Sequence, residues 1–137
     1  MTLEPTTASR DGEGRTTPWL MLDRSRATAW SNGRRLELRR KEFDLLAFLV
    51  DNVDRYVTRD EILEAVWDDR FGTCTNTLHV HLSRLRSKLG ESPASPTFVH
   101  TCRRRGVLVA GRRAHTFNPS VELYVARPAS LVALHAA

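Results

Sequence analysis

The stretch NTLHVHLSRLRSKL, residues 76–89, has the apolar spacing of one amphipathic helix. Its apolar side chains recur at i, i+4, i+7 and i+11; they are Leu78, Leu82, Leu85 and Leu89. The opposite pole carries Thr77, Val80, Arg84 and Ser87, with Lys88 beside them. Thr75 or Asn76 can cap the start, and Gly90 stands where a left-handed residue is expected after the end. We expect this helix to bury its leucines and to present its cationic side to a partner.

Positive charge is segregated along the 137-residue chain, whose net charge is +5. Between Asn76 and Arg113 there are eight lysines and arginines but a single acid, Glu91, whereas the rest of the chain has a slight excess of acids. Such a basic segment indicates a polyanionic partner. A solvated basic face without a partner is the alternative.

Several classes of protein are excluded by the composition. The two cysteines, Cys74 and Cys102, lack the spacing of a zinc finger or a disulfide framework, so we expect no bound metal and no cofactor. No apolar run approaches the roughly 18 residues that a membrane span needs. The N-terminus is polar and carries acids, unlike a signal peptide, so a cytoplasmic protein without membrane contact is expected.

The residues before the quoted helix predict a small antiparallel sheet and two helices. Strand-like segments cover 19–22, 26–30 and 34–38, and the Asn32-Gly33 pair predicts a tight turn between the last two. Residues 40–52 have a broad apolar helical face. Thr58 and Glu61 match a capping box that opens a second helix, which ends near Trp67.

The residues after Gly90 predict a β-hairpin. TFVHTC, residues 97–102, alternates like a strand, RRRG turns the chain, and VLVA, residues 107–110, forms the second strand. Residues 112–137 show no sustained period and few charges. We therefore expect a disordered arm or linker over 1–18, one domain over 19–111 and a tail of uncertain structure over 112–137.

A small sheet, three helices and a basic hairpin, in this order, outline an α+β winged helix-turn-helix. A helix about 10–12 Å wide fits the major groove of B-DNA. The hairpin can then reach a neighbouring groove and its phosphates. The expected function is sequence-specific binding of duplex DNA by a transcription regulator.

The sequence also resembles the OmpR/PhoB-type winged-helix domain of the response regulators of two-component systems. The resemblance covers residues 20–106 and rests on LRRKEFDLLAFLVDN, YVTRDEILEAVW, TNTLHVHLSRLRSKLG and FVHT, in this order. It implies a domain that binds promoter DNA, that answers to a phosphorelay and that is not an enzyme. Because no receiver domain precedes it in this sequence, a stand-alone module, a regulator controlled otherwise or a truncated product is implied.

The resemblance assigns roles to single residues. Arg84 matches the arginine that reads guanine and Val80 an outward position that touches a thymine methyl, with Ser87 on the same face as a third base contact. Phosphate contacts are expected from Asn76, Thr77, His81, Arg86, Lys88, Thr101, Arg103, Arg104 and Arg105. The alternatives are an ion pair of Arg86 with Asp44, a neutral surface imidazole at His81 and a capping role alone for Asn76.

The hairpin departs from the family pattern, Thr-Val-Arg-Gly-x-Gly-Tyr. Arg104 replaces the first glycine and Val107 the tyrosine, and arginine resists the positive φ that glycine permits. Additional arginines are expected to add nonspecific affinity at the expense of precision. A frameshift after Gly106 is an alternative explanation of both the altered hairpin and the unfamiliar tail.

The resemblance implies two protein partners as well. The loop after the second helix, through Asp68, Asp69 and Arg70, corresponds to a segment that can touch RNA polymerase in the family, although a solvated loop is an equal alternative. A second copy is expected to bind beside the first on direct-repeat DNA.

Two other classes of function compete with this interpretation. A metal-dependent hydrolase could use Asp68, Asp69, Cys74, His79 and His81, but the two histidines point about 200° apart on a helix and cannot chelate one ion. An interaction or RNA-binding module would use the same basic face, yet few aromatic residues are placed to stack on bases.

Overall fold

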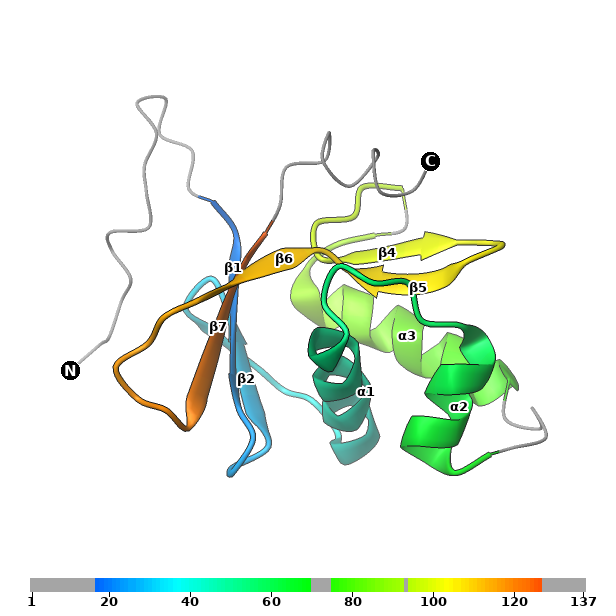
Figure 1. The fold of residues 1–137 in the computed structure, drawn as a ribbon, viewed down its shortest axis with the longest axis horizontal. Coiled ribbons are helices and arrows are strands. Elements are labelled where there is room, and N and C mark those ends of the chain that lie inside the picture. The colour runs from blue at the N-terminus through cyan, green and yellow to red at the C-terminus, as the bar shows by residue number, and fades with distance from the viewer. Residues whose placement is uncertain (1–16, 70–74, 93, 127–137) are drawn as a thin grey trace.

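Three helices pack between two antiparallel sheets in the computed structural model, which describes residues 17–69, 75–92 and 94–126 (Figure 1). The elements are, in chain order, β1 (Trp19–Asp23), β2 (Thr28–Ser31), β3 (Arg34–Leu36), α1 (Arg40–Asp51), α2 (Arg59–Trp67), α3 (Thr75–Leu89), β4 (Val99–Cys102), β5 (Gly106–Val109), β6 (Gly111–Ala114) and β7 (Val121–Ala126). One sheet has the strand order β3-β2-β1-β7-β6, and β4 pairs with β5. The predicted α+β winged-helix fold class is confirmed.

Local sequence signals set several of these boundaries. Asn32 and Gly33 both have positive φ, 52° and 85°, as the two-residue turn between β2 and β3 requires. The predicted capping box at α2 is present, because the amide of Glu61 donates to Thr58 Oγ1 at 3.1 Å and the amide of Thr58 donates to Glu61 Oε1 at 2.9 Å. The helix start and the turn are therefore local properties of the sequence.

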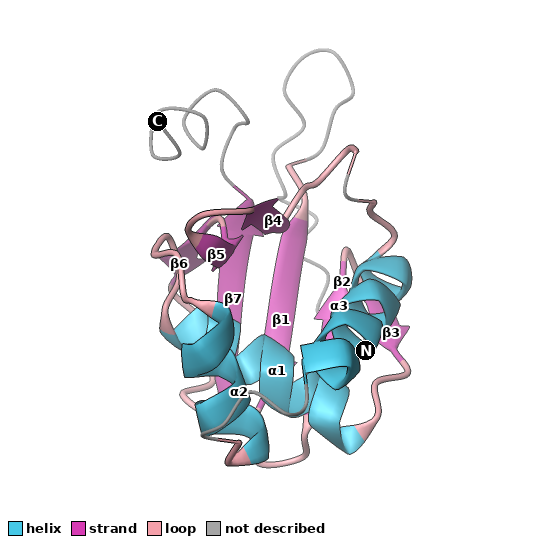
Figure 2. Cartoon of the chain, turned by 90° about the vertical axis from the view of Figure 1, so that its right-hand side faces the viewer, coloured by secondary structure: helices cyan, strands magenta, loops and turns pink. Residues whose placement is uncertain are grey.

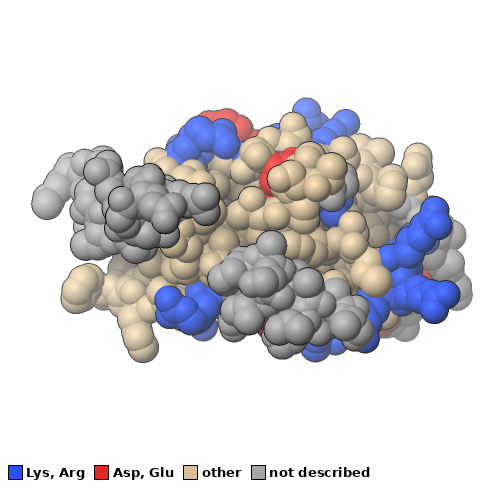
Figure 3. Space-filling model, turned by 90° about the horizontal axis from the view of Figure 1, so that it is seen from above, with Lys and Arg blue, Asp and Glu red and all other residues tan. Residues whose placement is uncertain are grey.

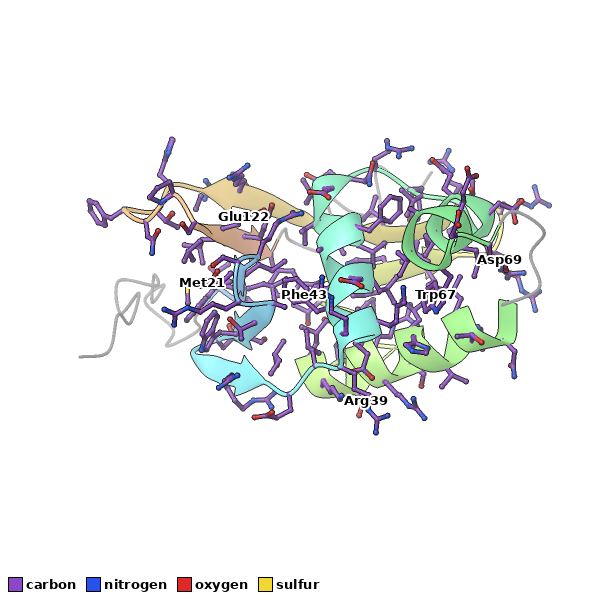
Figure 4. All side chains as sticks on the ribbon, turned by 90° about the horizontal axis from the view of Figure 1, so that it is seen from below. Met21, Arg39, Phe43, Trp67, Asp69 and Glu122 are labelled. Carbon is purple, nitrogen blue, oxygen red and sulfur yellow. The ribbon has the colours of Figure 1, made fainter. Side chains whose placement is uncertain are left out.

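One face of the five-stranded sheet packs on the helices. Figure 2 shows the broad face of β1 and β7 behind the three helices. Leu20, Leu22, Ala29 and Tyr124 belong to the same buried cluster as Phe43 of α1, which Figure 4 labels. The opposite face of the sheet is therefore turned away from the helices.

Strands β6 and β7 were not predicted from the sequence. β7 pairs with β1 along its length, from Trp19 opposite Val125 to Asp23 opposite Val121, so it lies inside the sheet and not at its edge. The alternation is too short to be recognised: within β7 only Tyr124 is fully buried, and β6 exposes both of its arginines. The tail expected from residue 112 onward thus contributes two strands to the sheet.

Among the helices that the structure describes, none has the length and apolar character needed to cross a lipid bilayer.

Candidate nucleic-acid interface

Helix α3 is anchored by the four leucines that the sequence placed on one face. Leu78, Leu82, Leu85 and Leu89 are all buried in the main core, with exposed fractions of 8% or less. The helix packs against both α1 and α2. Because this stripe is held from two sides, the opposite pole of α3 is presented in a fixed orientation.

That opposite pole carries the predicted base-contacting residues. Val80 is 39% exposed, one of two large hydrophobic side chains exposed in the described part of the chain. Arg84 and Ser87 are exposed on the same side of the helix, as is Asn76 at its first turn, while Thr77 is half-buried. No other described residue makes a hydrogen bond or ion pair with the Arg84 guanidinium. An exposed valine beside such an arginine is costly in water and suits contact with base edges.

His81 makes two contacts within the protein, one through a ring nitrogen and one through the face or edge of its ring. Its Nδ1 lies 2.8 Å from the carbonyl oxygen of Thr77, so the proton on Nδ1 is donated within the helix. Its ring meets Trp67 edge to face, with 5.1 Å between ring centroids and an interplanar angle of 78°. Figure 4 shows Trp67 between α2 and α3. Nε2 is the ring nitrogen of His81 that takes no part in the hydrogen bond to Thr77.

Two of the predicted phosphate contacts are turned inward instead. Arg86 is only 7% exposed, and its Nε and Nη2 have no hydrogen-bond partner among the residues described. Burial lowers the pKa of this guanidinium, and the nearby Glu91 carboxylate partly opposes that shift. The alternative partner Asp44 pairs with Arg40 instead, at 3.2 Å. A buried guanidinium is not presented to DNA, so we leave Arg86 out of the interface.

Lys88 is the second predicted phosphate contact whose charged group is engaged within the protein. Its Nζ lies 2.5 Å from Oε1 of Glu42, which has no solvent exposure. Because its ammonium pairs with a buried carboxylate, we leave Lys88 out of the interface as well.

The sequence interpretation missed the residues that hold the C-terminal end of α3. Arg34 of β3 donates from Nη2 to the carbonyl oxygen of Lys88 at 3.0 Å. Glu91, just beyond the helix, accepts hydrogen bonds from the backbone amides of Thr97, Phe98 and Val99. Free carbonyls in the last helical turn, followed by an acid, were the available signal. Arg34 lies 54 residues from Lys88, and spacing alone does not show that Glu91 turns to amides six to eight residues further on.

The β4–β5 hairpin, residues 99–109, is the wing of this winged helix. Thr101, Arg103, Arg104 and Arg105 are all exposed, and basic side chains gather at the right-hand end of the molecule in Figure 3, where Figure 1 draws the β4–β5 turn. The guanidinium of Arg105 lies over the ring of Tyr56, 5.8 Å from its centroid. None of the three turn arginines has positive φ, so the backbone strain expected at Arg104 does not arise.

The second glycine of the family pattern keeps its role. Gly106 has a φ of +111°, and a Cβ there would lie 2.0 Å from the carbonyl oxygen of Val57. Val57 and Val107 exchange two backbone hydrogen bonds at 2.8 and 2.9 Å. This bridge fixes the wing on the segment that precedes α2, and only glycine fits at residue 106.

The wing contains a free thiol but no metal site. Cys102 is half-buried, and hydrogen bonding from the backbone of Arg104 and Arg105 lowers the pKa of the thiol. Within residues 17–69, 75–92 and 94–126 no three His, Cys, Asp or Glu side chains come together as metal ligands would. Cys74 lies outside the described residues.

Of the predicted polymerase-contact loop, the structure describes two residues. Asp68 is exposed and ends α2 with a left-handed φ of 54°. Asp69 is half-buried, and its amide donates to the carbonyl oxygen of Leu63 at 3.1 Å. Arg70 lies outside the described residues.

A buried helix stripe, an outward polar face and a basic β-hairpin beside it define a winged helix-turn-helix protein. A family model described as "Transcriptional regulatory protein, C terminal" matches residues 33–109. The chain therefore belongs to this family, the OmpR/PhoB-type winged-helix DNA-binding domains.

Relatives and solved structures agree with this membership. The chain is 40% identical over 90 residues to the sensory transduction protein RegX3 of Mycolicibacterium smegmatis, covering 66% of this chain and 40% of RegX3. It is 41% identical over 70 residues to the transcriptional regulatory protein VxrB of Vibrio cholerae, covering 51% of this chain and 29% of VxrB. The chain thus spans less than half the length of these relatives.

Two DNA-binding domains show the same fold. The Klebsiella pneumoniae RstA DNA-binding domain, solved in complex with the RstA box, superposes with a TM-score of 0.62 at 26% identity, over 66% of this chain and 90% of that chain. The DNA-binding domain of CpxR from E. coli gives a TM-score of 0.57 at 31% identity, over 66% and 88% of the two chains.

Proposed function

We propose that this chain is a sequence-specific DNA-binding transcription regulator that inserts α3 into the major groove of promoter DNA. The observation that carries the proposal is the exposed Val80–Arg84–Ser87 face of a helix whose opposite side is fully anchored. The RstA domain, which has this fold, is solved with its DNA box.

We assign base contacts to Arg84, Val80 and Ser87. Arg84 pairs with guanine O6 and N7, and Val80 packs on a thymine methyl. Phosphate contacts come from the remaining exposed or half-buried residues of the predicted set, which are Asn76, Thr77, His81, Thr101, Arg103, Arg104 and Arg105. In this division the base contacts of α3 recognise the DNA sequence, and the phosphate contacts of the wing fix the position of the protein on the duplex.

The protein partners are a further part of the proposal. Asp68 and Asp69, at the end of α2, with Arg70 beyond them, are proposed to meet RNA polymerase. A second copy is proposed to bind the neighbouring half of a direct repeat. The chain acts in the cytoplasm by binding and not by catalysis, and the family membership supports both statements.

The test is selection from random duplex DNA with the purified chain, followed by titration of the winning sequence and a scrambled control at two salt concentrations. A short motif bound at least tenfold more tightly than its scramble is the expected result. Salt-sensitive binding without sequence preference would refute the proposal and favour a nonspecific nucleic-acid-binding module.

A further inference from the structure

The face of the five-stranded sheet that is turned away from the helices carries an apolar row. Strand register places four apolar residues side by side on β2, β1, β7 and β6, with Arg35 of β3 at the end of the row: Trp30, Met21, Leu123 and Ala114. A second row on the same face runs from Trp19 through Val125 to Arg112. Met21, Trp30, Leu123 and Val125 are each only half-buried, and Figure 4 shows Met21 well away from Phe43 and the helices.

Arginines border this apolar face on both sides. Arg35 lies on the edge strand β3 and Arg112 on the edge strand β6, roughly 19 Å apart for strands about 4.8 Å from one another. Both side chains are exposed, and neither makes a hydrogen bond or ion pair with another described residue. Asp23, the acid of β1 on this face, already accepts hydrogen bonds from Ser25 and from the backbone amide of Arg26. The face is therefore apolar in the middle and cationic at its two edges.

The β6–β7 turn adds an aromatic anchor next to this face. Phe117 is fully exposed, at 108% of the reference area. The turn is held by Thr116, whose Oγ1 lies 2.8 and 2.9 Å from the carbonyl oxygens of Asn118 and Val121 and shares its single proton between them. An aromatic side chain that an ordered turn holds in water is a typical anchor for a protein partner. Residues 111–126 lie beyond the part that the family model matches.

We propose that this face docks an amphipathic helix of a partner protein, with the apolar stripe of that helix bordered by acidic residues on both sides. A helix about 10–12 Å wide fits between the two arginines, and sheets commonly bury a face under helices. Its carboxylates pair with Arg35 and Arg112, and its apolar side chains cover Trp30, Met21 and Leu123.

Charge distinguishes this occupant from two others. A second copy of the chain would bring cationic edges together across a two-fold axis. Residues 127–137 of the chain itself contain Leu131, Val132 and Leu134 but no acid. In Figure 1 the β6–β7 turn lies at the opposite end of the long axis from the β4–β5 turn. A partner docked on this face leaves α3 and the wing free.

The test uses the full chain and two synthetic 18-residue helical peptides with the same leucine stripe, one with glutamates and one with lysines on both flanks. Fluorescence anisotropy of labelled peptide gives the affinity, and the fluorescence of Trp19 and Trp30 in a Trp67→Phe background reports on the face. The glutamate peptide is expected to bind at least tenfold more tightly than the lysine peptide. Arg35→Glu combined with Arg112→Glu should weaken its binding at least fivefold, and Phe117→Ser about threefold. Arg59→Glu, an exposed arginine on α2, is the matched control and should change nothing.

Equal binding of the two peptides, no binding of either, or an unchanged affinity in the double variant would overturn the proposal. So would a dimer in light scattering that the double variant abolishes, since a second copy would then be the occupant. Peptide binding that appears only after removal of residues 127–137 would assign the face to that segment instead. DNA binding by the same variants is measured in parallel. Neither arginine belongs to the proposed DNA interface, so a loss of DNA binding would indicate that the variant is misfolded.

Discussion

The ammonium of Lys88 lies 2.5 Å from the fully buried Oε1 of Glu42 and joins the last turn of α3 to the first turn of α1. The same Oε1 accepts a hydrogen bond from the backbone amide of Arg39 at 2.9 Å. This ion pair therefore adds to the buried leucines that hold α3 against α1. Lys88, expected from the sequence to contact phosphate, pairs in the structure with a carboxylate of α1.

Lys88→Met should lower the free energy of unfolding by about 3 kcal/mol at pH 7, because it leaves the Glu42 carboxylate buried without its counter-ion. Urea unfolding followed by circular dichroism measures the change. Arg40→Met is the control, since it removes the more exposed pair with Asp44 and should cost less than about 1 kcal/mol. Equal losses in the two variants would mean that Glu42 is not buried as described.

The same pair makes a prediction about pH. Burial raises the pKa of Glu42, but the hydrogen bonds from Lys88 and the Arg39 amide outweigh it, so the pKa is lowered overall. A carboxylate with a depressed pKa stabilises the fold above the pKa of the unfolded chain, about 4.3. That contribution is lost as the pH falls through the lower folded value. In Lys88→Met the counter-ion is gone and burial raises the pKa of Glu42, so the difference in stability between the wild type and the variant should begin to shrink above about pH 4.3 and continue to shrink as the pH falls through the lowered pKa of the wild type. A difference independent of pH would contradict the assignment.

Residues close in sequence determine the parts of the fold that could be predicted. The leucine spacing of α3, the Thr58–Glu61 capping box and the Asn32-Gly33 turn each lie within a few residues, and the structure contains all three. Arg84 and Val80 were correctly placed on the outward face because helical angle follows from spacing alone.

How deeply a side chain at the edge of an apolar helix face is buried cannot be predicted from spacing, because it depends on residues far away in the sequence. Arg86 follows Leu85 directly at the edge of the apolar face, yet it is only 7% exposed and lies near the Glu91 carboxylate. Lys88 meets Glu42, which lies 46 residues away. Strand β7 lies inside the sheet because it pairs with β1. Its own sequence gives little sign of this, since only one of its residues, Tyr124, is fully buried. The burial of these side chains and the place of β7 therefore follow from tertiary contacts, which the spacing of residues does not reveal.

Arg84→Ala should weaken binding to the selected DNA site by about 1–3 kcal/mol and relax the preference at one base pair. Titration of the chosen site and of its single-base variants measures both effects. Arg26→Ala is the matched control, because this arginine is exposed on the β1–β2 turn, away from α3. An equal loss of affinity for scrambled DNA would reassign Arg84 to a phosphate.

Replacing Arg103, Arg104 and Arg105 with alanine should weaken binding to every duplex and flatten the salt dependence. For every phosphate that the variant no longer neutralises, the slope of log K against log salt should fall by about 0.9. The melting temperature should change little, because the three side chains are exposed. A triple variant with an unaltered slope would remove the wing from the DNA interface.

Gly106→Ala should cost more than about 2 kcal/mol of stability, because the added Cβ would collide with the backbone of Val57 at a strained φ. Gly90→Ala is the matched control: its φ is +80°, but the nearest atom to a Cβ is the flexible Arg34 side chain at 3.9 Å. It should cost about 1 kcal/mol from conformational strain alone. Similar losses would show that the Val57–Val107 bridge is not a tight constraint.

Tyr124 tests whether the C-terminal strands are part of the core. Its ring is 3% exposed in the same cluster as Leu20 and Leu22, and its hydroxyl donates to Glu122 at 2.7 Å. Tyr124→Ala should therefore cost about 3 kcal/mol. Tyr124→Phe keeps the ring and should cost about 1 kcal/mol because it removes the hydrogen bond. A fully stable Tyr124→Ala variant would show that β6 and β7 are an appendage and not a structural part of the sheet.

Alkaline titration gives an independent measure of the burial of Tyr124. Burial, together with the hydrogen bond to Glu122, raises the pKa of Tyr124 to about 12. Because the folded pKa lies above the unfolded value of about 10, the stabilisation is complete below pH 10 and is lost as the pH rises towards 12. Absorbance at high pH should show a tyrosinate transition near 12 that Tyr124→Phe abolishes. If both tyrosines titrate near pH 10 in the folded chain, the Tyr124 ring is exposed to solvent and β7 does not lie against the core.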